Sequence, residues 1–158
     1  VFAFLPRLLE RAGTAEKGSI TGMYAVLVEG DDMDEPIADA MRAILDGHIV
    51  LSRSLANKNH YPAVDVLASI SRIMSEVTEE THRRAAKRLL TLLAEYRAAE
   101  DLITIGAYVK GSNAEVDKGL SIINDANQFL RQGISDKTDF VVLVKTLQAI
   151  VAKADGKA

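Results

Sequence analysis

The sequence has no cysteine among its 158 residues. This excludes disulfide frameworks, thiolate zinc sites and cysteine nucleophiles together. No apolar run approaches the roughly 20 residues that a membrane-spanning helix requires. The longest candidate, residues 23–28, has the length of a buried strand. Near the N-terminus, Pro6, Arg7 and Glu10 interrupt the apolar stretch, which argues against a signal peptide.

The sequence also lacks the strong positive charge that is typical of nucleic-acid-binding domains. It has 19 Lys and Arg against 22 Asp and Glu, for a formal net charge of -3. Hydrophobic residues make up 48% and charged residues 26%, proportions typical of a folded globular protein rather than a disordered one. The length suits one ordinary domain or two small ones.

Several catalytic motifs are missing as well. The sequence contains no G-x-S-x-G, no H-E-x-x-H and no phosphate-binding G-x-x-x-x-G-K-[ST] loop. The three histidines, His48, His60 and His82, have no metal-ligand spacing, so we expect core or surface roles for them and no metal site.

The first half of the chain, residues 1–76, mixes predicted strands and helices. Residues 20–28 are apolar and β-branched without clean alternation, which predicts a strand covered on both faces in a parallel sheet. Pro36 favours a helix start, and Gly47 predicts its end. A second short strand is predicted over residues 48–51, which completes a βαβ unit.

The second half, residues 77–158, has the period of helices instead. Thr78 is the predicted N-cap of the first helix. Ser112 opens the second, with capping-box spacing to Glu115. The residues predicted to face inward are Leu89, Leu92, Leu93 and Tyr96 in the first helix, Val116, Leu120, Ile123 and Phe129 or Leu130 in the second, and Phe140, Leu143, Val144, Leu147, Ile150 and Val151 in the third. The pattern predicts a small helical bundle.

Three phrases within residues 18–72 follow one another with short connections: GSITGMYAVLVEGDDMDEPIAD, LDGHIVLSR and HYPAVDVLASISR. In this order they resemble the last part of the nucleotide-binding domain of the rotary ATPases, and most closely the type III protein export ATPases of the flagellar kind. The resemblance implies an α/β part followed by an all-α part. These are the C-terminal portion of a RecA-like P-loop nucleotide-binding domain, residues 1–76, and a small C-terminal helical domain, residues 77–158.

The resemblance implies that Arg72 is an arginine finger, which reaches into the neighbouring subunit's site and offsets charge on the transferred phosphoryl group. A planar, permanently charged guanidinium suits phosphate oxygens. The alternative is an arginine that caps a helix or pairs with a surface carboxylate. The surrounding SISR and the upstream YPAVD favour the finger.

The resemblance also implies that Tyr61 stacks on the adenine ring, with Pro62 restricting the tyrosine backbone. The alternative is a half-buried tyrosine that supports a turn. Phe129 is the available aromatic partner in the helical half, and the family's adenine-facing position also fits near Ile134.

The acidic loop at Asp31, Asp32, Asp34 and Glu35 lacks the glycine and the distant glutamate of a calcium loop. By itself it is a solvated turn before a helix N-terminus. The resemblance implies that it faces a central pore and contacts a coiled-coil stalk protein. The turn at residues 110–117 lies where synthase relatives carry an acidic run that touches the shaft. It holds only two acids here, so a plain helix–turn–helix connection is the favoured interpretation.

The resemblance implies an ATP hydrolase of type III protein export, of which this chain is the C-terminal portion. ATP and Mg²⁺ are the expected cofactors of the full-length enzyme, and the chain alone is expected to bind neither and to be inactive. Expected partners are like subunits in a hexameric ring, a stalk protein, a regulator, and export chaperones with their cargo. The expected location is the cytoplasmic face of the inner membrane. Alternatives are an ATP synthase-type subunit fragment, a stand-alone helical interaction module and, least favoured because of the acidic balance, a hexameric nucleic-acid translocase.

Overall fold

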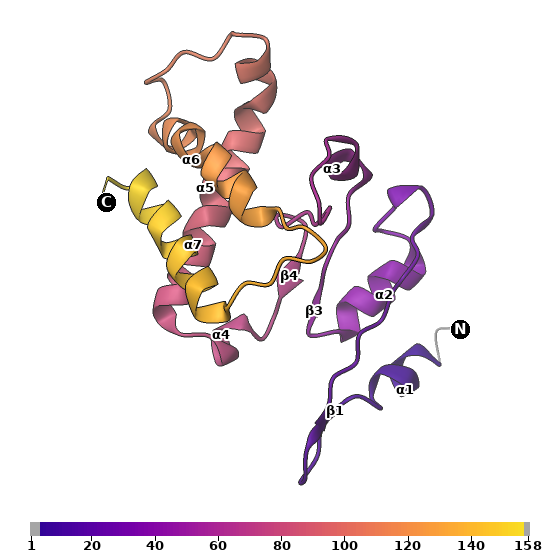
Figure 1. Ribbon diagram of the computed structural model, residues 1–158. Coiled ribbons are helices and arrows are strands. Elements are labelled where there is room, and N and C mark those ends of the chain that lie inside the picture. Colours follow the sequence, from indigo (N-terminus) through magenta and orange to yellow (C-terminus); the bar gives the residue numbers. More distant parts are fainter. Residues whose placement is uncertain (1–3, 157–158) are drawn as a thin grey trace. The chain divides into compact units, whose positions relative to one another are not determined.

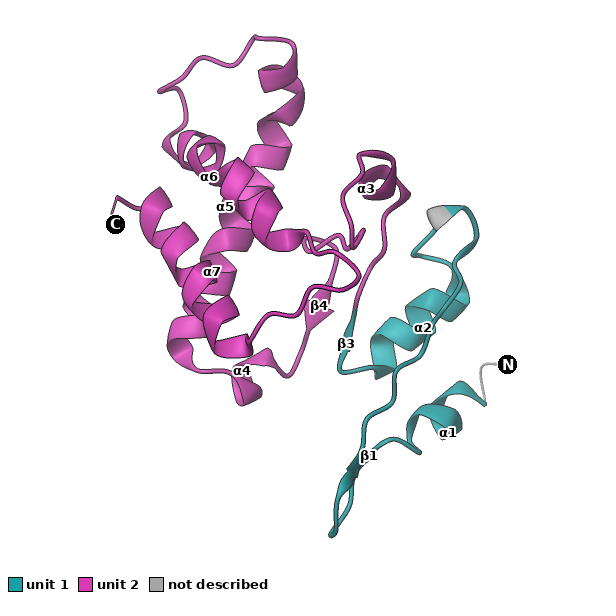
Figure 2. Cartoon of the chain, in the orientation of Figure 1, with its two compact units in different colours: residues 1–48 teal, residues 49–158 magenta. Residues whose placement is uncertain are grey.

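The computed structural model describes residues 4–156, without the side chain of Asp31. The chain forms two compact units, residues 1–48 and 49–158 (Figure 2). Short strands and helices come first, and three long helices follow (Figure 1). This order of elements confirms the predicted α/β part followed by an all-α part.

The first unit is made of short elements. They are α1 (Leu5–Leu9), β1 (Gly13–Thr14), β2 (Ser19–Ile20), the 3-10 helix η1 (Glu29–Asp31), α2 (Pro36–Ile44) and β3 (Gly47–His48). β1 and β2 form an antiparallel hairpin in which Gly13 lies opposite Ile20. α1 contacts α2, and the buried residues of the two helices are Leu9, Ala38 and Met41. Helix α2 begins at Pro36, as predicted, and ends at Ile44, three residues before Gly47.

The predicted strand over residues 20–28 is wrong in this structure. Only Ser19–Ile20 is paired, and residues 21–28 belong to no helix or strand. Met23 is 87% exposed and Leu27 is 95% exposed, where a buried strand was expected. A strand is stabilised by ladder hydrogen bonds to a neighbouring backbone, and no described residue pairs with residues 21–28.

The second unit contains the long helices. Its elements are α3 (Arg53–Asn57), β4 (Ile70–Ser71), α4 (Met74–Val77), α5 (Glu80–Thr104), α6 (Ala114–Leu130) and α7 (Phe140–Ala154). Helices α5, α6 and α7 pack against one another in pairs (Figure 1). Their common core is Ala85, Leu89, Leu92, Ile122, Ala126, Leu147, Ile150 and Ala154. The helical bundle predicted for this half is therefore present.

The buried face of α6 differs from the predicted face by about one residue. Val116 is buried as predicted, but the other buried positions are Gly119, Ile122 and Ala126. Gly119 explains the shift, because a Cβ added there would lie 2.8 Å from the Leu92 carbonyl oxygen. The missing side chain lets the backbones of α5 and α6 approach closely, which turns the Gly119 side of α6 toward α5.

The caps of the helices also correct the sequence interpretation. Asn113, not Ser112, caps α6: its side chain accepts hydrogen bonds from the amides of Glu115 and Val116. Thr78 is not the N-cap of α5, because its hydroxyl donates back to the Met74 carbonyl at 2.5 Å. Ser and Asn have about equal preference at an N-cap, so spacing alone does not choose between Ser112 and Asn113.

No helix in the part of the chain that the structure describes has the length and apolarity needed to cross a membrane.

Candidate functional site

The segment around Tyr61 is folded back on itself in the second unit. Leu51 and Val64 form an antiparallel bridge. Two further bonds flank it: the Ser52 amide donates to the Ala63 carbonyl at 2.9 Å, and the Asp65 amide donates to the Val50 carbonyl at 2.8 Å. Ser52 also caps α3, since its side chain accepts from the Leu55 amide. The Tyr61–Pro62 turn therefore lies at the end of a braced loop.

Tyr61 itself is 54% exposed and is joined to Pro62 by a cis peptide bond. Its carbonyl accepts a hydrogen bond from the Gln132 amide at 2.9 Å. Gln132 lies just beyond the last residue of α6. The structure thus brings the predicted aromatic residue to the C-terminal end of α6, with its ring still accessible.

His60 is a site residue that the sequence did not single out. His60 is only 6% exposed. Its pKa is lowered, first by burial and then by the nearby charge of Arg131, and the backbone of Leu130 raises it by a smaller amount. The position directly before Tyr61 was its only sequence signal. The sequence predicted a core or surface role for His60, but it did not predict that His60 lies beside α6.

A cavity of about 400 Å³ lies beside His60. Residues 52–67 form one wall, and α5 and α6 supply the others. Two ion pairs join residues of this lining: Arg97 Nη1 lies 3.0 Å from Asp65 Oδ2, and Lys58 Nζ lies 3.2 Å from Glu100 Oε1.

Asp65 organises the chain between Tyr61 and Arg72. Its Oδ1 accepts hydrogen bonds from the amides of Leu67 and Ala68, at 3.0 and 3.2 Å. Its carbonyl accepts from the Ser69 hydroxyl at 2.7 Å. Burial raises the pKa of the Asp65 carboxyl, but the hydrogen bond and charge of Arg97, aided by the two amides, outweigh burial and lower it overall. The carboxylate is therefore kept ionised as the centre of a fixed turn.

Arg72 follows β4 directly and has an exposed side chain. Ser69, three residues earlier, is held on two sides, because its hydroxyl also accepts from the Val50 amide at 3.0 Å. Asp65 and Ser69 therefore brace the backbone that leads into β4. Tyr61 and Arg72 lie on the same compact unit, and both are exposed.

Phe129 and Ile134 have different surroundings. Phe129 is half-buried against the helical core and lines a second cavity of about 470 Å³ with residues of α6 and α7. Ile134 is fully exposed. Gln132, whose amide bonds to Tyr61, lies between them in the chain.

Three carboxylates of the acidic loop accept hydrogen bonds or form an ion pair within the first unit. Asp32 accepts the Asp34 amide at 3.0 Å, and Asp34 lies 3.4 Å from Arg42 of α2. The Glu35 carboxylate accepts the Glu29 amide at 3.4 Å. Asp34 nevertheless remains 92% exposed. The side chain of Asp31 lies outside the described set.

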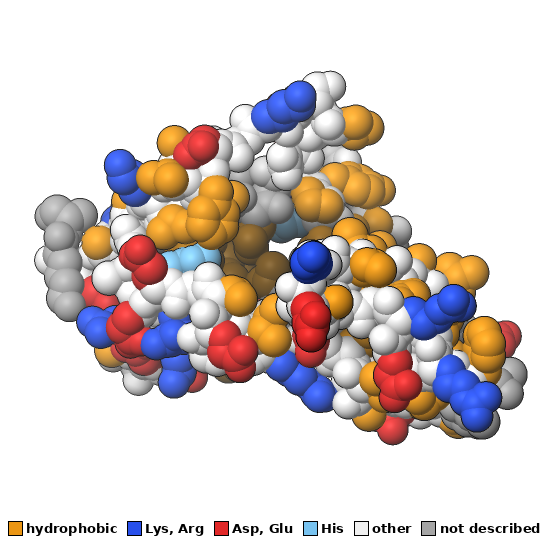
Figure 3. Space-filling model, turned by 90° about the horizontal axis from the view of Figure 1, so that it is seen from below, with side chains coloured by type: hydrophobic (Ala, Val, Ile, Leu, Met, Phe, Trp, Pro, Cys, Tyr) orange, Lys and Arg blue, Asp and Glu red, His pale blue; other side chains and the backbone are white. Residues whose placement is uncertain are grey.

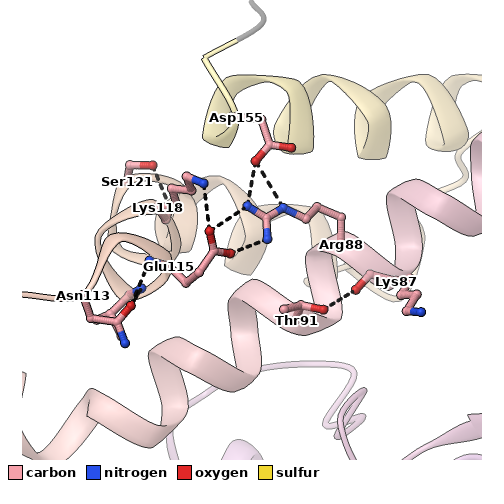
Figure 4. A network of polar contacts seen from close by, with 9 residues as sticks. Lys87, Arg88, Thr91, Asn113, Glu115, Lys118, Ser121 and Asp155 are labelled. Carbon is pink, nitrogen blue, oxygen red and sulfur yellow. Dashed lines mark hydrogen bonds and ion pairs between the residues drawn. The ribbon is translucent and has the colours of Figure 1, made fainter.

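The two acids of the turn between α5 and α6 both bond within the second unit. Asp117 accepts the Gly111 amide at 2.8 Å and the Tyr108 hydroxyl at 3.0 Å. Glu115 binds Arg88, which also lies 2.7 Å from Asp155 (Figure 4). The Arg88 hydrogen bond, and then that of Lys118, lowers the Glu115 pKa to about 2. Both acids therefore bond to residues of the helical domain, in agreement with a plain helix–turn–helix connection.

Comparisons with known proteins match both parts of the chain. Residues 1–71 match the nucleotide-binding domain of the ATP synthase alpha/beta family, and residues 78–149 match the T3SS EscN ATPase C-terminal domain. Residues 1–71 thus belong to the ATP synthase alpha/beta family, and residues 78–149 to the C-terminal domain of the type III secretion ATPases.

Individual relatives agree with this assignment. The flagellum-specific ATP synthase of Bacillus subtilis is 56% identical over 136 residues, which are 86% of this chain and 31% of that protein. The SPI-2 type 3 secretion system ATPase of Salmonella typhimurium is 50% identical over 153 residues, or 97% of this chain and 35% of that protein. The assembled ATPase EscN of enteropathogenic E. coli superposes with a TM-score of 0.92 at 45% identity, over 96% of this chain and 37% of that one. The chain thus spans about a third of the length of these family members.

Proposed function

We propose that this chain is the C-terminal portion of a flagellar or type III secretion ATPase, which couples ATP hydrolysis in a hexameric ring of like subunits to protein export. In this reaction the enzyme releases chaperones and unfolds cargo. The proposal is supported by the matches in both halves and by the relatives, which are named as ATPases. Residues 1–76 are the end of the nucleotide-binding domain, and residues 77–158 are the helical domain. The matched ranges, 1–71 and 78–149, lie on either side of that boundary.

One observation carries the assignment of the site: the chain between Tyr61 and Arg72 contains a turn that is hydrogen-bonded to Asp65. Tyr61 and Pro62 contact adenine, with Phe129 or the residues near Ile134 beside them. Arg72 reaches the nucleotide of the neighbouring subunit. A rigid loop suits both roles, because each needs a side chain held in one position.

Mg²⁺ is the metal that ATP hydrolysis in this family implies. Among the described residues no group of three potential ligands is close enough to hold a metal ion. The proposal therefore assigns to the residues of this chain only contacts with adenine and with the transferred phosphoryl group, and gives them no role in holding Mg²⁺.

Replacing Arg72 in the full-length ATPase tests the function. Arg72→Ala should lower turnover by about a thousandfold or more while nucleotide affinity stays close to wild type, because the finger acts on charge that develops in the transition state. Arg72→Lys is the matched control for charge without the planar fork, and we expect it to restore little. Ordinary turnover in Arg72→Ala would remove the finger assignment.

The acidic loop is proposed to contact a coiled-coil stalk protein at the centre of the ring. A related ATPase, EscN, is described in complex with its central stalk EscO. The exposed carboxylate of Asp34, with Asp31, Asp32 and Glu35 in the same loop, would attract a basic helix over about a Debye length. Binding of the stalk to the full-length ATPase should weaken as salt rises. The proposed location is the cytoplasmic face of the inner membrane, with a regulator, chaperones and cargo as further partners.

A second candidate is a stand-alone module that binds another protein. Three adjacent apolar residues at the start of α7, Phe140, Val141 and Val142, are each more than half exposed, and such a patch can serve as a docking surface. The coding frame upstream of Val1 distinguishes the candidates: a glycine-rich lysine loop within a few hundred residues supports the enzyme, and an adjacent start codon supports the module. The face in Figure 3 mixes acidic, basic and apolar side chains.

A further inference from the structure

His60 is the one buried polar residue among the described residues of the chain. A buried polar group is costly unless it is hydrogen-bonded. His60 lies directly before Tyr61 and shares the lining of the 400 Å³ cavity with Leu130 and Arg131. Its burial therefore places it between the Tyr61 turn and the end of α6.

His60 lies beside a helix end. Leu130 is the last residue of α6, so its carbonyl has no partner within the helix. The His60 side chain and Leu130 line the same cavity, and the Leu130 backbone favours the protonated imidazole, which raises the pKa of His60 against the larger lowering effects of burial and Arg131. The next residue, Tyr61, accepts the Gln132 amide at 2.9 Å. Two neighbouring residues of the loop thus lie against the end of α6: His60 beside Leu130, and Tyr61 bonded to Gln132.

We propose that His60 is a positioning residue that fixes the Tyr61–Pro62 turn to the C-terminal end of α6, so that the adenine contact depends on the helical domain. The inference rests on the proposed role of Tyr61. The packing of buried His60 beside Leu130 and the Gln132–Tyr61 hydrogen bond act as one joint: when it is intact, the tyrosine ring is held ready for the nucleotide. When either contact is lost, the ring samples other positions and nucleotide binding weakens.

The experiment measures kcat and KM for ATP in the full-length ATPase. His60→Phe keeps a ring of similar size but has no N–H to donate. We expect it to raise KM about two- to tenfold, the effect of one net hydrogen bond, with a smaller change in kcat. His60→Gln keeps a donor and should recover part of the loss. His82→Phe makes the same substitution at a half-buried histidine that packs on Phe140 instead, and should leave KM unchanged.

Variants of Gln132 test the other contact of the same joint, and they include a matched control. Gln132→Pro removes the amide that donates to Tyr61, and Gln132→Ala removes only the side chain. Arg131 already has φ -93° and ψ 144°, an extended conformation that a following proline accepts. We expect Gln132→Pro to raise KM as His60→Phe does, and by more than Gln132→Ala, which loses the side-chain bond to the Asp136 carbonyl but keeps the backbone amide.

Tyr61→Ala separates failure of this inference from failure of the proposed function. If Tyr61→Ala raises KM, the adenine role stands, and His60→Phe should then add little in the double variant because both act through one contact. Wild-type KM in His60→Phe and Gln132→Pro, or fully multiplicative effects in the double variant, would overturn the joint alone. An unchanged KM in Tyr61→Ala would overturn the adenine assignment and this inference together.

Discussion

At the scale of single residues, hydrogen bonds to the backbone decide where the candidate site residues lie. Asp65 binds two amides of the following turn, Ser69 bonds to both Val50 and Asp65, and buried His60 lies beside the end of α6. None of these three touches the reacting groups in the proposed function. They hold the exposed residues Tyr61 and Arg72 at fixed places on one unit.

The buried His60 should make stability depend on pH. Its pKa is lower in the folded chain than the ordinary 6.5, so the unfolded chain takes up a proton first as pH falls. The free energy of unfolding should therefore decrease below about pH 6.5, by at most about 1.4 kcal/mol per pH unit, until the folded-state pKa is reached. The charged groups that line the same cavity are Lys58, Asp65, Arg97, Glu100 and Arg131.

Urea unfolding of the chain at several pH values between 5 and 8, a range chosen to bracket about pH 6.5, measures this slope. In His60→Phe the decrease should be smaller. Asp65 contributes in another window: its lowered pKa stabilises the fold above its ordinary 3.8, and that contribution is lost only at more acid pH. An equal slope in both proteins would show that His60 is not the group responsible.

At the scale of elements, the helical bundle depends on a close approach of α5 and α6 at Gly119. Gly119→Ala improves intrinsic helix propensity, yet we expect the variant to be less stable by about 1–3 kcal/mol. The added Cβ would lie 2.8 Å from the Leu92 carbonyl oxygen and 3.2 Å from the Tyr96 Cβ, so the helices must separate. Thermal or urea unfolding tests this. Ala114→Gly, at the exposed first residue of α6, is a control for propensity alone, and a more stable Gly119→Ala protein would contradict the close approach.

Arg88 connects all three long helices (Figure 4). Its guanidinium binds Glu115 of α6 and lies 2.7 Å from Asp155, which caps the end of α7. These hydrogen bonds and charges raise the pKa of Arg88, which therefore stays protonated. Arg88→Met should lower stability by about 1–3 kcal/mol, because partly buried acceptors lose a charged donor.

The matched control is Arg84→Met, on the same helix. Arg84 has a side chain that is 77% exposed and a 3.5 Å contact to Glu80 within its own helix. Exposed pairs of this kind contribute little, so the control should unfold close to wild type. A similar loss of stability in both variants would mean that helix propensity, and not the link between helices, explains the effect at Arg88.

At the scale of the whole molecule, the chain has the residues that we propose to face a nucleotide, but its sequence contains no phosphate-binding loop. The sequence contains no G-x-x-x-x-G-K-[ST], and the described residues contain no group of metal ligands. We therefore expect the purified chain to show no magnesium-dependent ATP hydrolysis in a phosphate-release assay. Measurable turnover that persists through purification, and that Arg72→Ala abolishes, would contradict this prediction.

The sequence by itself determined the long helices and the family. The apolar period of residues 77–158 is a local property, and it correctly predicted the bundle and the inward positions Leu92 and Leu147. The phrases around Tyr61 and Arg72 identified the family before any fold was known. Both inferences depend on neighbours along the chain, which a sequence displays directly.

The tertiary structure alone decided which groups meet. It showed that residues 21–28 are unpaired, that Asn113 rather than Ser112 caps α6, and that buried His60 shares a cavity with Leu130, seventy positions away. Strand pairing and burial depend on atoms supplied by distant segments, because backbone and side-chain hydrogen bonds need a partner within about 3 Å. The choice of cap depends on local backbone geometry, which composition and spacing do not give. No local pattern encodes that partner.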